Sequence, residues 1–291
     1  MARRGRIMRV FWMTCGTMLA FAANSVLNRM GVGAGRIDPA LFAVVRLASG
    51  AAVLAILVGL RRGAVWPGWR GRLPGVAGLL VYLFGFSAAY LQLDAGTGAL
   101  ILFGVVQVTM FAGALLGGEA LPARRIGGAA LALSGLAYLL APKGGPLLAE
   151  AAMAAAGFGW GIYSLAGRHQ NDALAAPAWN FILACPVGLV ALALWPGQGW
   201  ALPVTLPTPE GLALAVISGG VTSGLGYAVW YAVLPRLGAS RAAVAQLSVP
   251  LIATFGGFAL LGELPGPGFA LAACLVLGGV GVASWPIRPP R

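Results

Sequence analysis

Apolar residues dominate the chain in ten long stretches that are separated by short polar connections. A helix needs ~20 consecutive apolar residues to cross the hydrocarbon core of a membrane, and each stretch is about that long. The pattern therefore predicts an all-α membrane protein with ten transmembrane helices, whose ends are placed to within ~3 residues. The predicted spans are 8–30, 39–60, 73–92, 97–117, 122–141, 147–167, 174–195, 210–233, 239–261 and 265–286.

The apolar pattern also repeats within the chain. Residues 111–142 and 255–286, offset by 144 positions, share ten identical residues in 32, where a chain rich in Gly, Ala and Leu gives about four by chance. Each half holds five predicted helices, so the second half enters the membrane from the opposite side. We therefore predict two inverted repeats, residues 1–142 and 143–291, an organisation that places a transporter's substrate site between its halves.

The positive charges lie mainly on one side of the predicted helices. Fifteen of the nineteen Lys and Arg residues lie in or close to the connections on the side of the N-terminus, three lie on the other side, and Arg46 lies inside the second helix. Cytoplasmic connections retain the excess of Lys and Arg, so we expect a multi-pass protein of the bacterial cell inner membrane with both termini cytoplasmic. The net charge of +12 is then an orientation signal, and no nucleic-acid partner is expected.

Composition and residue types argue against a soluble domain and against an enzyme. Apolar residues make up 59% of the chain, charged residues 9%, and the mean hydropathy is +0.88, so lipid is the expected surrounding. The one histidine, His169, falls in a predicted cytoplasmic connection, and the carboxylates lie near helix ends. We predict no catalytic residue, no metal and no cofactor. Glu119 and Glu263 are closest to the spans, and we favour a role in capping helix ends or anchoring loops. The cysteines have no paired spacing and are expected to be small core residues.

Several short motifs, taken in order along the chain, resemble the drug/metabolite transporter superfamily in its EamA-type branch. They are Gly118–Leu121 and Gly262–Pro265 at two helix ends, Phe21–Arg29 and Trp160–Arg168 opening the halves, Arg46-Leu47, and Gly224–Trp230. Within that branch, the aromatic pattern is similar to that of bacterial aromatic amino-acid exporters. One departure is that the ninth predicted helix carries the expected proline, Pro250, whereas the fourth has Val106-Gln107 at the matching place. The two halves are therefore expected to bend differently.

The resemblance implies a central cavity lined by the first, third, fourth, sixth, eighth and ninth helices. Tyr82 and Phe86, four positions apart, share one face of the third helix. Tyr and Trp are also common at membrane interfaces, and buried amides can simply join helices, so packing remains the alternative. The predicted substrate-binding residues are Asn24, Tyr82, Gln107, Trp160, Tyr163, Tyr227 and Gln246, and the predicted hinge residues are Pro250, Gly256 and Gly257.

Arg46 is the one full charge placed well inside a predicted span, ~10 Å along the helix from its outer end. It could pair with a substrate carboxylate. The resemblance implies that this arginine is shared by family members with different substrates. We therefore favour a structural role, in which the guanidinium bonds backbone carbonyls or a helix end.

The predicted cavity lacks both a carboxylate, which a carrier of cations needs, and a basic cluster, which a carrier of phosphates needs. It suits zwitterionic or uncharged metabolites, with aromatic amino acids first and other neutral amino acids next. The leading hypothesis is export by alternating access. The alternatives are a carrier of another solute, such as a purine, a sugar or a lipophilic drug, and a membrane protein that binds without transporting. The oligomeric state stays open and is compatible with a monomer.

Overall fold

The computed structural model describes residues 2–61, 66, 68–69, 71–117, 123–139, 146–167, 170, 172–194 and 206–284. Within these residues the chain is helical and contains no strand, which confirms the predicted all-α class. The helices are α1 (Ala2–Asn28), η1 (Arg29–Gly33), α2 (Pro39–Leu60), α3 (Arg72–Ala89), α4 (Ala95–Leu116), α5 (Ala123–Leu139), α6 (Leu147–Gly167), α7 (Ala175–Leu194), α8 (Pro209–Ile217), η2 (Ser218–Leu225), α9 (Gly226–Gln246), α10 (Ser248–Leu261) and α11 (Pro267–Ser284), where η1 and η2 are π-helical.

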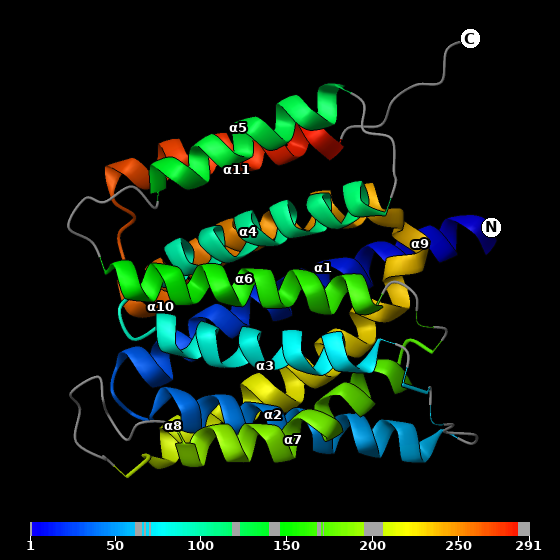
Figure 1. Ribbon diagram of the computed structural model, residues 1–291, viewed down its shortest axis with the longest axis vertical. Helices are drawn as coiled ribbons and strands as arrows, with labels where there is room; N and C mark the ends of the chain where they lie inside the picture. Colours follow the sequence, from blue (N-terminus) through cyan, green and yellow to red (C-terminus); the bar gives the residue numbers. More distant parts are fainter. Residues whose placement is uncertain are drawn as a thin grey trace.

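The helices lie side by side along one direction and form a bundle (Figure 1). On one side of the bundle α5 packs against α11, and on the other side α2 packs against α7. Between these pairs, α6 contacts both α3 and α4, while α1 contacts α9 and α10. The start of α1 and the end of α11 lie at the same end of the bundle (Figure 1). We call the opposite end the far end.

Among the described residues, six helical segments are long and apolar enough to cross a membrane by length and composition. Three shorter apolar helices accompany them, within α5, α10 and α11. These findings support a multi-pass membrane protein, and the count of ten spans stays a prediction. The six segments are Ile7–Gly33, Pro39–Leu60, Arg72–Ala89, Ala95–Gly113, Ala175–Leu194 and Pro209–Leu234.

The predicted boundary between the eighth and ninth helices, between residues 233 and 239, is wrong. The chain stays helical from Pro209 to Gln246, and α10 begins only at Ser248. A proline is tolerated inside a membrane helix, so position 235 does not end α9. The break coincides with Pro250 instead, because a proline ring clashes with the carbonyl four residues earlier, here that of Gln246. In the first turn of α10 the missing N–H costs nothing. By contrast, α4 passes Val106 and Gln107 unbroken, so the chain has a helix break beside Pro250 and none at the position predicted to match it.

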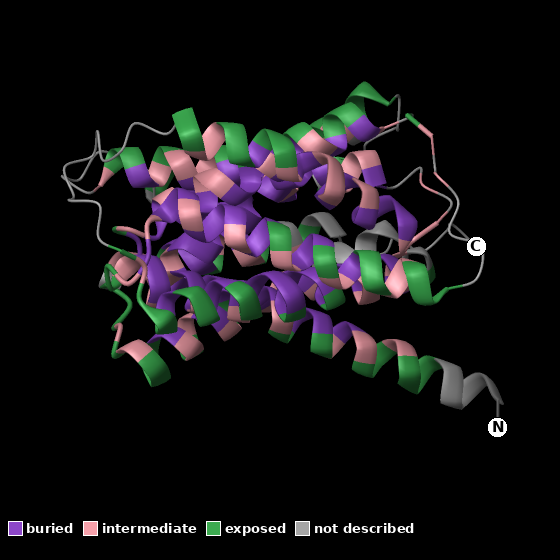
Figure 2. Cartoon of the chain, turned by 90° about the horizontal axis from the view of Figure 1, so that it is seen from below, coloured by how far each residue is buried: buried purple, intermediate pink, exposed green. Residues whose placement is uncertain are grey.

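The pattern of burial is the one expected of a protein surrounded by lipid. Buried residues lie along the middle of the bundle and exposed ones on its outer helices (Figure 2). Large apolar side chains are the most exposed, such as Leu116 at 91% and Phe255 at 71%. Polar side chains are buried instead, among them Asn24, Asn28 and Arg46. Such exposed apolar patches suit contact with lipid tails. Cys274 shares this exposed surface and is not the core residue expected, whereas Cys15 and Cys185 are half-buried.

Glycines allow α3 and α6 to approach closely. A Cβ added at Gly78 would lie 2.6 Å from the carbonyl oxygen of Gly159, and one added at Gly159 would lie 2.7 Å from that of Gly78. Neither distance is sterically possible without moving a backbone. Membrane helices associate mainly by packing, which small residues improve by letting backbones meet.

We expect Gly159→Ala to destabilise the protein, because the added methyl group forces α3 away from α6. The cost is on the order of 1–3 kcal/mol, as for other overpacked sites. The measurement is the thermal midpoint of the detergent-purified protein. Gly278→Ala on α11 is the matched control, since nothing lies within 4 Å of a Cβ there, and helix propensity alone favours Ala over Gly. Equal stability of the two variants would contradict the close approach.

Candidate functional site

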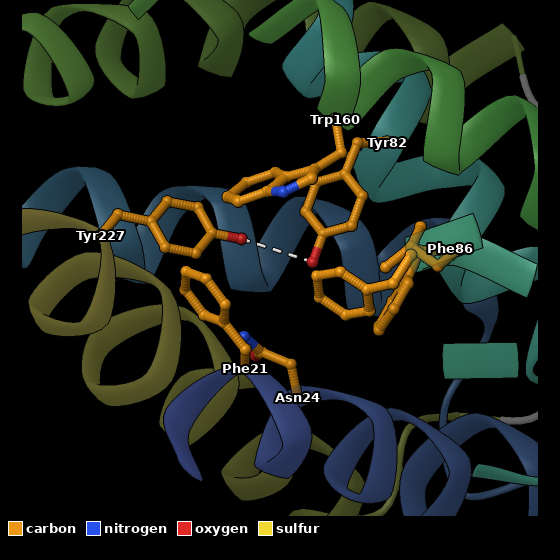
Figure 3. Close-up of a pocket in the computed structure, with 8 residues that line it drawn as sticks. Phe21, Asn24, Tyr82, Phe86, Trp160 and Tyr227 are labelled. Atoms are coloured by element: carbon orange, nitrogen blue, oxygen red, sulfur yellow. Dashed lines mark hydrogen bonds between the residues drawn. The ribbon is translucent and has the colours of Figure 1, made fainter. Parts of the chain in front are cut away.

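A small cavity lies between the helices that the resemblance places around a central site (Figure 3). Its volume is about 10 Å³, which is room for roughly one water molecule. Ligand pockets for small molecules are far larger, at about 300–1,000 Å³, so this conformation is closed. The lining residues are Phe21, Asn24, Tyr82, Phe86, Leu102, Phe103, Trp160 and Tyr227, contributed by α1, α3, α4, α6 and α9.

Aromatic rings fill the space around the cavity. Phe21 makes edge-to-face contacts with Trp160 and Tyr227, at centroid distances of 5.7 and 5.8 Å. Trp160 also lies 4.9 Å from the ring of Tyr82 and 4.8 Å from that of Tyr227. Edge-to-face and tilted arrangements of this kind match the charge distribution of aromatic rings.

Asn24 brings an amide to this aromatic surface. Its Oδ1 accepts a hydrogen bond from the Ser218 hydroxyl at 2.7 Å and another from the Thr222 hydroxyl. Both hydroxyls belong to η2, so the amide oxygen joins α1 to the π-helical segment. Asn24 therefore lines the cavity and also joins two helical segments through hydrogen bonds.

Arg46 lies directly behind two of the lining tyrosines. Its Nη2 donates to the hydroxyls of Tyr82, at 2.7 Å, and Tyr227, at 3.2 Å. Its Nε donates to the Ser223 hydroxyl at 2.9 Å. The two tyrosines are themselves joined, since the Tyr227 hydroxyl donates to that of Tyr82 at 3.3 Å (Figure 3). The sequence favoured carbonyls or a helix end as partners, and this detail is wrong, because the partners are side-chain hydroxyls.

Four predicted binding residues, Asn24, Tyr82, Trp160 and Tyr227, line the cavity. Tyr163 stacks on Trp160 at 5.3 Å, one layer away from the cavity lining. The two predicted glutamines are not among the lining residues: Gln107 lies on α4, and Gln246 ends α9. Substrate contact by any of these residues stays a prediction. So do the hinge roles of Pro250, in the first turn of α10, and of Gly256 and Gly257, which lie within it.

Three lining residues escaped the sequence prediction: Phe21, Leu102 and Phe103. Phe21 precedes Asn24 by three positions and so shares its helix face, a signal that could have found it. Leu102 and Phe103 lie within an unbroken apolar helix, where nothing in the sequence separates them from residues that face lipid. Phe86 lines the cavity beside Tyr82, as their shared face predicted.

The comparisons with known proteins decide the family. A sequence profile described as the EamA-like transporter family matches residues 147–285. An uncharacterised protein of Pseudomonas aeruginosa is 45% identical over 277 residues, which cover 94% of this chain and 93% of that protein. The chain belongs to the EamA-like transporter family. The resemblance drawn from short motifs is thereby confirmed, and the protein is a membrane transporter by family.

More distant relatives of this EamA-type transporter agree with the assignment. A protein of Streptantibioticus cattleyicolor described as a probable terminal-alkyne amino-acid exporter is 26% identical over 219 residues, covering 72% of this chain and 69% of that protein. A crystal structure that is 23% identical matches with a TM-score of 0.63 over 92% of this chain and 96% of that one. At this identity the crystal structure supports the fold alone.

Charged groups of the transporter gather at the far end. Arg29 donates from Nε to Glu263 Oε1 at 2.7 Å and lies 3.7 Å from Asp94 Oδ1. The other oxygen of Glu263 accepts the backbone N–H of Ala95 at 2.8 Å. Glu263 thus caps the first turn of α4, which confirms its predicted role in capping a helix end. We call Arg29, Asp94 and Glu263 the far-end network; Glu119, its counterpart in the repeat, lies outside the described residues.

Two aspartates in the connections have shifted pKa values. Partial burial and the nearby charge of Glu263 raise the pKa of Asp94, although Arg29 opposes the shift. Partial burial acts to raise the pKa of Asp172 as well, but hydrogen bonds from the backbone N–H groups of Ala175 and Leu174, together with Arg61, lower it overall. Neither carboxylate touches the cavity, whose lining residues are all uncharged. Among the described residues no cluster of His, Cys, Asp and Glu could hold a metal ion.

We expect Glu263→Gln to loosen the far end, because it removes the charge that Arg29 meets. A hydrogen bond to a charged group contributes about 1.5–3 kcal/mol, so local opening should become several-fold more frequent. The measurement is the labelling rate of Thr97→Cys by a water-soluble thiol reagent, with the three native cysteines replaced. Thr97 lines a small hollow beside Glu263.

Glu210→Gln is the matched control for this test. It removes a carboxylate from the more exposed pair that Arg36 forms with Glu210 at 3.1 Å, also at the far end. Exposed pairs contribute little, so labelling should stay near the wild-type rate. If the two variants label equally fast, the far-end network is not what holds this end together.

Proposed function

We propose that this transporter carries small zwitterionic or neutral metabolites, aromatic amino acids first, and exports them across the bacterial inner membrane by alternating access. The observation that carries the proposal is the cavity, whose lining among the described residues consists of aromatic rings, one leucine and one amide and includes no charged residue. Such a lining accepts a flat apolar ring and offers polar partners to the rest of a small molecule. The cavity is built by a single chain, so the proposal needs no second copy.

The helix contacts support the proposed repeats, residues 1–142 and 143–291. Helices at matching places in the two halves contact each other, as α2 does with α7, α4 with α10 and α5 with α11. The contact of α3 with α6 has its counterpart in that of α1 with α9. An approximate two-fold axis in the membrane plane relates such pairs. We infer ten spans with both termini cytoplasmic, since the side of the N-terminus carries most of the positive charge.

The aromatic contacts explain how the halves would form an alternating site. Phe21 and Tyr82 belong to the first proposed half, whereas Trp160 and Tyr227 belong to the second, so the ring contacts cross between halves. A substrate requires these rings to part, and the two halves rocking against each other would achieve this. The far-end network then acts as a closure on the outer side, because it joins η1 and α4 of the first half to Glu263, which follows α10 in the second.

The substrate class follows from charge and shape. A cavity without a carboxylate does not favour cations, and one without a basic cluster does not favour phosphates. An amino acid with an aromatic side chain has a near-zero net charge and a flat ring that would pack among Phe21, Trp160 and Tyr227 once these residues part. The relative described as a probable amino-acid exporter supports this class. Net direction depends on the gradient, because alternating access is reversible.

Uptake of labelled tryptophan into liposomes that contain the purified protein tests the proposal. We expect saturable entry, competed by phenylalanine and independent of a pH gradient. Trp160→Ala should lower entry at least ten-fold, since loss of a buried aromatic contact costs on the order of 2 kcal/mol at a binding hot spot. Trp12→Ala is the matched control, because Trp12 is 65% exposed on α1 and should transport normally.

Other outcomes would replace the proposal. Entry competed by a purine, a sugar or a lipophilic drug, and not by tryptophan or phenylalanine, would assign a different solute. Saturable binding without flux would indicate a membrane protein that binds without transporting. Unchanged entry in Trp160→Ala, with wild-type uptake intact, would move the site away from the cavity described above.

A further inference from the structure

Arg46 is fully buried, with no exposed surface, in the middle of α2. Its neighbours are the hydroxyls of Tyr82, Tyr227 and Ser223 and the faces of two aromatic rings. The guanidinium carbon lies 5.1 Å from the ring centroids of both Tyr82 and Phe86. All of these groups are neutral, so they bond the cation without balancing its charge.

The charge of Arg46 has no carboxylate partner among the described residues. The ion pairs found there join Arg29, Arg36 and Arg61 to acids. A buried cation without an anion is costly, because hydroxyl bonds and cation–π contacts offset only part of the lost hydration. One nitrogen, Nη1, has no hydrogen-bond partner within the part of the chain that the structure describes. A helix-joining role would be served by neutral side chains at much lower cost, as the Asn28 amide does when it donates to Ser87 at 3.0 Å.

Arg46 is separated from the cavity only by residues that line it. Tyr82, Phe86 and Tyr227 contact the guanidinium on one side and border the cavity on the other. The link between Tyr82 and Tyr227 crosses between the proposed halves, so it must open when the halves part. Opening it frees the Nη2 donors that the two tyrosine hydroxyls occupy, on the side of Arg46 where these residues border the cavity.

The local backbone is built to hold the guanidinium in place. Gly219 in η2 touches α2, where a Cβ would overlap the carbonyl oxygen of Arg46 itself. This approach brings Ser223, from the same π-helical segment, within bonding distance of Nε. Short π-helical segments inside longer helices are frequent at functional sites. The fork of a guanidinium fixed in this way matches a carboxylate, which can accept two parallel hydrogen bonds.

We propose that Arg46 binds the carboxylate of the transported zwitterion when Tyr82 and Tyr227 separate. The proposal rests on the proposed function, because it assigns a part of the same substrate to a residue of the same site. The aromatic side chain then lies among the rings of the cavity, and the negative group lies against α2. The tyrosine hydroxyls accept hydrogen bonds from the guanidinium while the site is closed. The substrate carboxylate replaces them as the acceptor when the site opens.

The test compares L-tryptophan with L-tryptophanamide, which has the same ring and amine but a neutral amide in place of the carboxylate. Affinities are measured on the purified full-length protein at about pH 6, where both amines stay protonated. We expect the wild type to prefer tryptophan by at least about ten-fold, the usual size of a charge-assisted hydrogen-bond pair. Arg46→Gln should abolish that preference and leave the amide's affinity nearly unchanged.

Two further variants separate the role of the guanidinium from effects on folding and from the loss of a buried arginine in general. Arg46→Lys retains the charge without the fork, so it should keep an intermediate preference, and it serves if the glutamine variant does not fold. Arg72→Gln is the matched control: Arg72 is also buried, but it bonds the Ala176 carbonyl oxygen at 2.6 Å and Asn180 Oδ1 at 2.9 Å, and neither residue lines the cavity. This variant should keep the full preference.

Failures of the two proposals are separable. If the wild type binds neither compound, the proposed function fails, and the proposed role of Arg46 fails with it. If the wild type binds both equally, or if Arg46→Gln and Arg46→Lys keep the full preference for tryptophan, the proposed function stands and the role of Arg46 is overturned.

Discussion

Glycine facing glycine lets α3 and α6 meet backbone to backbone, and the central cavity depends on this contact. Lipid tails offer no hydrophobic drive for helix association, so packing has to supply it. Gly78 lies one helical turn before Tyr82, and Gly159 directly precedes Trp160. A Cβ at Gly159 would also lie 2.8 Å from the backbone nitrogen of Tyr82. The contact that stabilises the helix pair is therefore the one that sets the indole 4.9 Å from the tyrosine ring.

The second constraint is that polar groups inside a membrane must find partners within the protein. Asn24 satisfies it with hydroxyls of η2, and Asn28 with Ser87. Acids and bases that pair with each other stay at the ends of the bundle, as Arg29 and Glu263 do. Arg46 lies within α2, away from both of its ends, and its hydrogen-bond partners are hydroxyls that carry no charge. The interior thus separates into ends held by opposite charges and a centre where a single cation lies beside neutral rings.

Much of the fold could be predicted from the sequence, because long apolar stretches allow few structures in a membrane. The ends of α2 and α6 fall where hydropathy and flanking residues placed them. The boundary between α9 and α10 at Leu247 could not be found in this way. A membrane helix tolerates Pro235, whereas Pro250 ends the preceding helix at Gln246, four residues before the proline itself. Hydropathy measures transfer into lipid and does not register a clash between a proline ring and a particular carbonyl.

The residues that line the cavity could be predicted from the sequence mainly where the side chain carries a polar group. Aromatic hydroxyls, an indole and an amide near mid-span identified Tyr82, Trp160 and Asn24. Leu102 and Phe103 carry no such mark, because the rotation of α4 about its axis decides whether they face the cavity or lipid. The neighbours of Arg46 lie on α3, η2 and α9, and nothing in the sequence near Arg46 indicates that hydroxyls from those distant segments converge on it.

The proposed halves differ from each other where the polar contacts of the site are made. In the first half α3 runs as a regular helix, but its counterpart passes through the π-helical segment η2. Each residue inserted in this way rotates the remainder of the helix by about 100°. The rotation helps to turn Ser218 and Thr222 toward Asn24 and Ser223 toward Arg46, although all lie within one short segment. A perfect repeat would place the helices around the cavity. The π-helical segment η2 in addition supplies the hydroxyls that hydrogen-bond Asn24 and Arg46 beside that cavity.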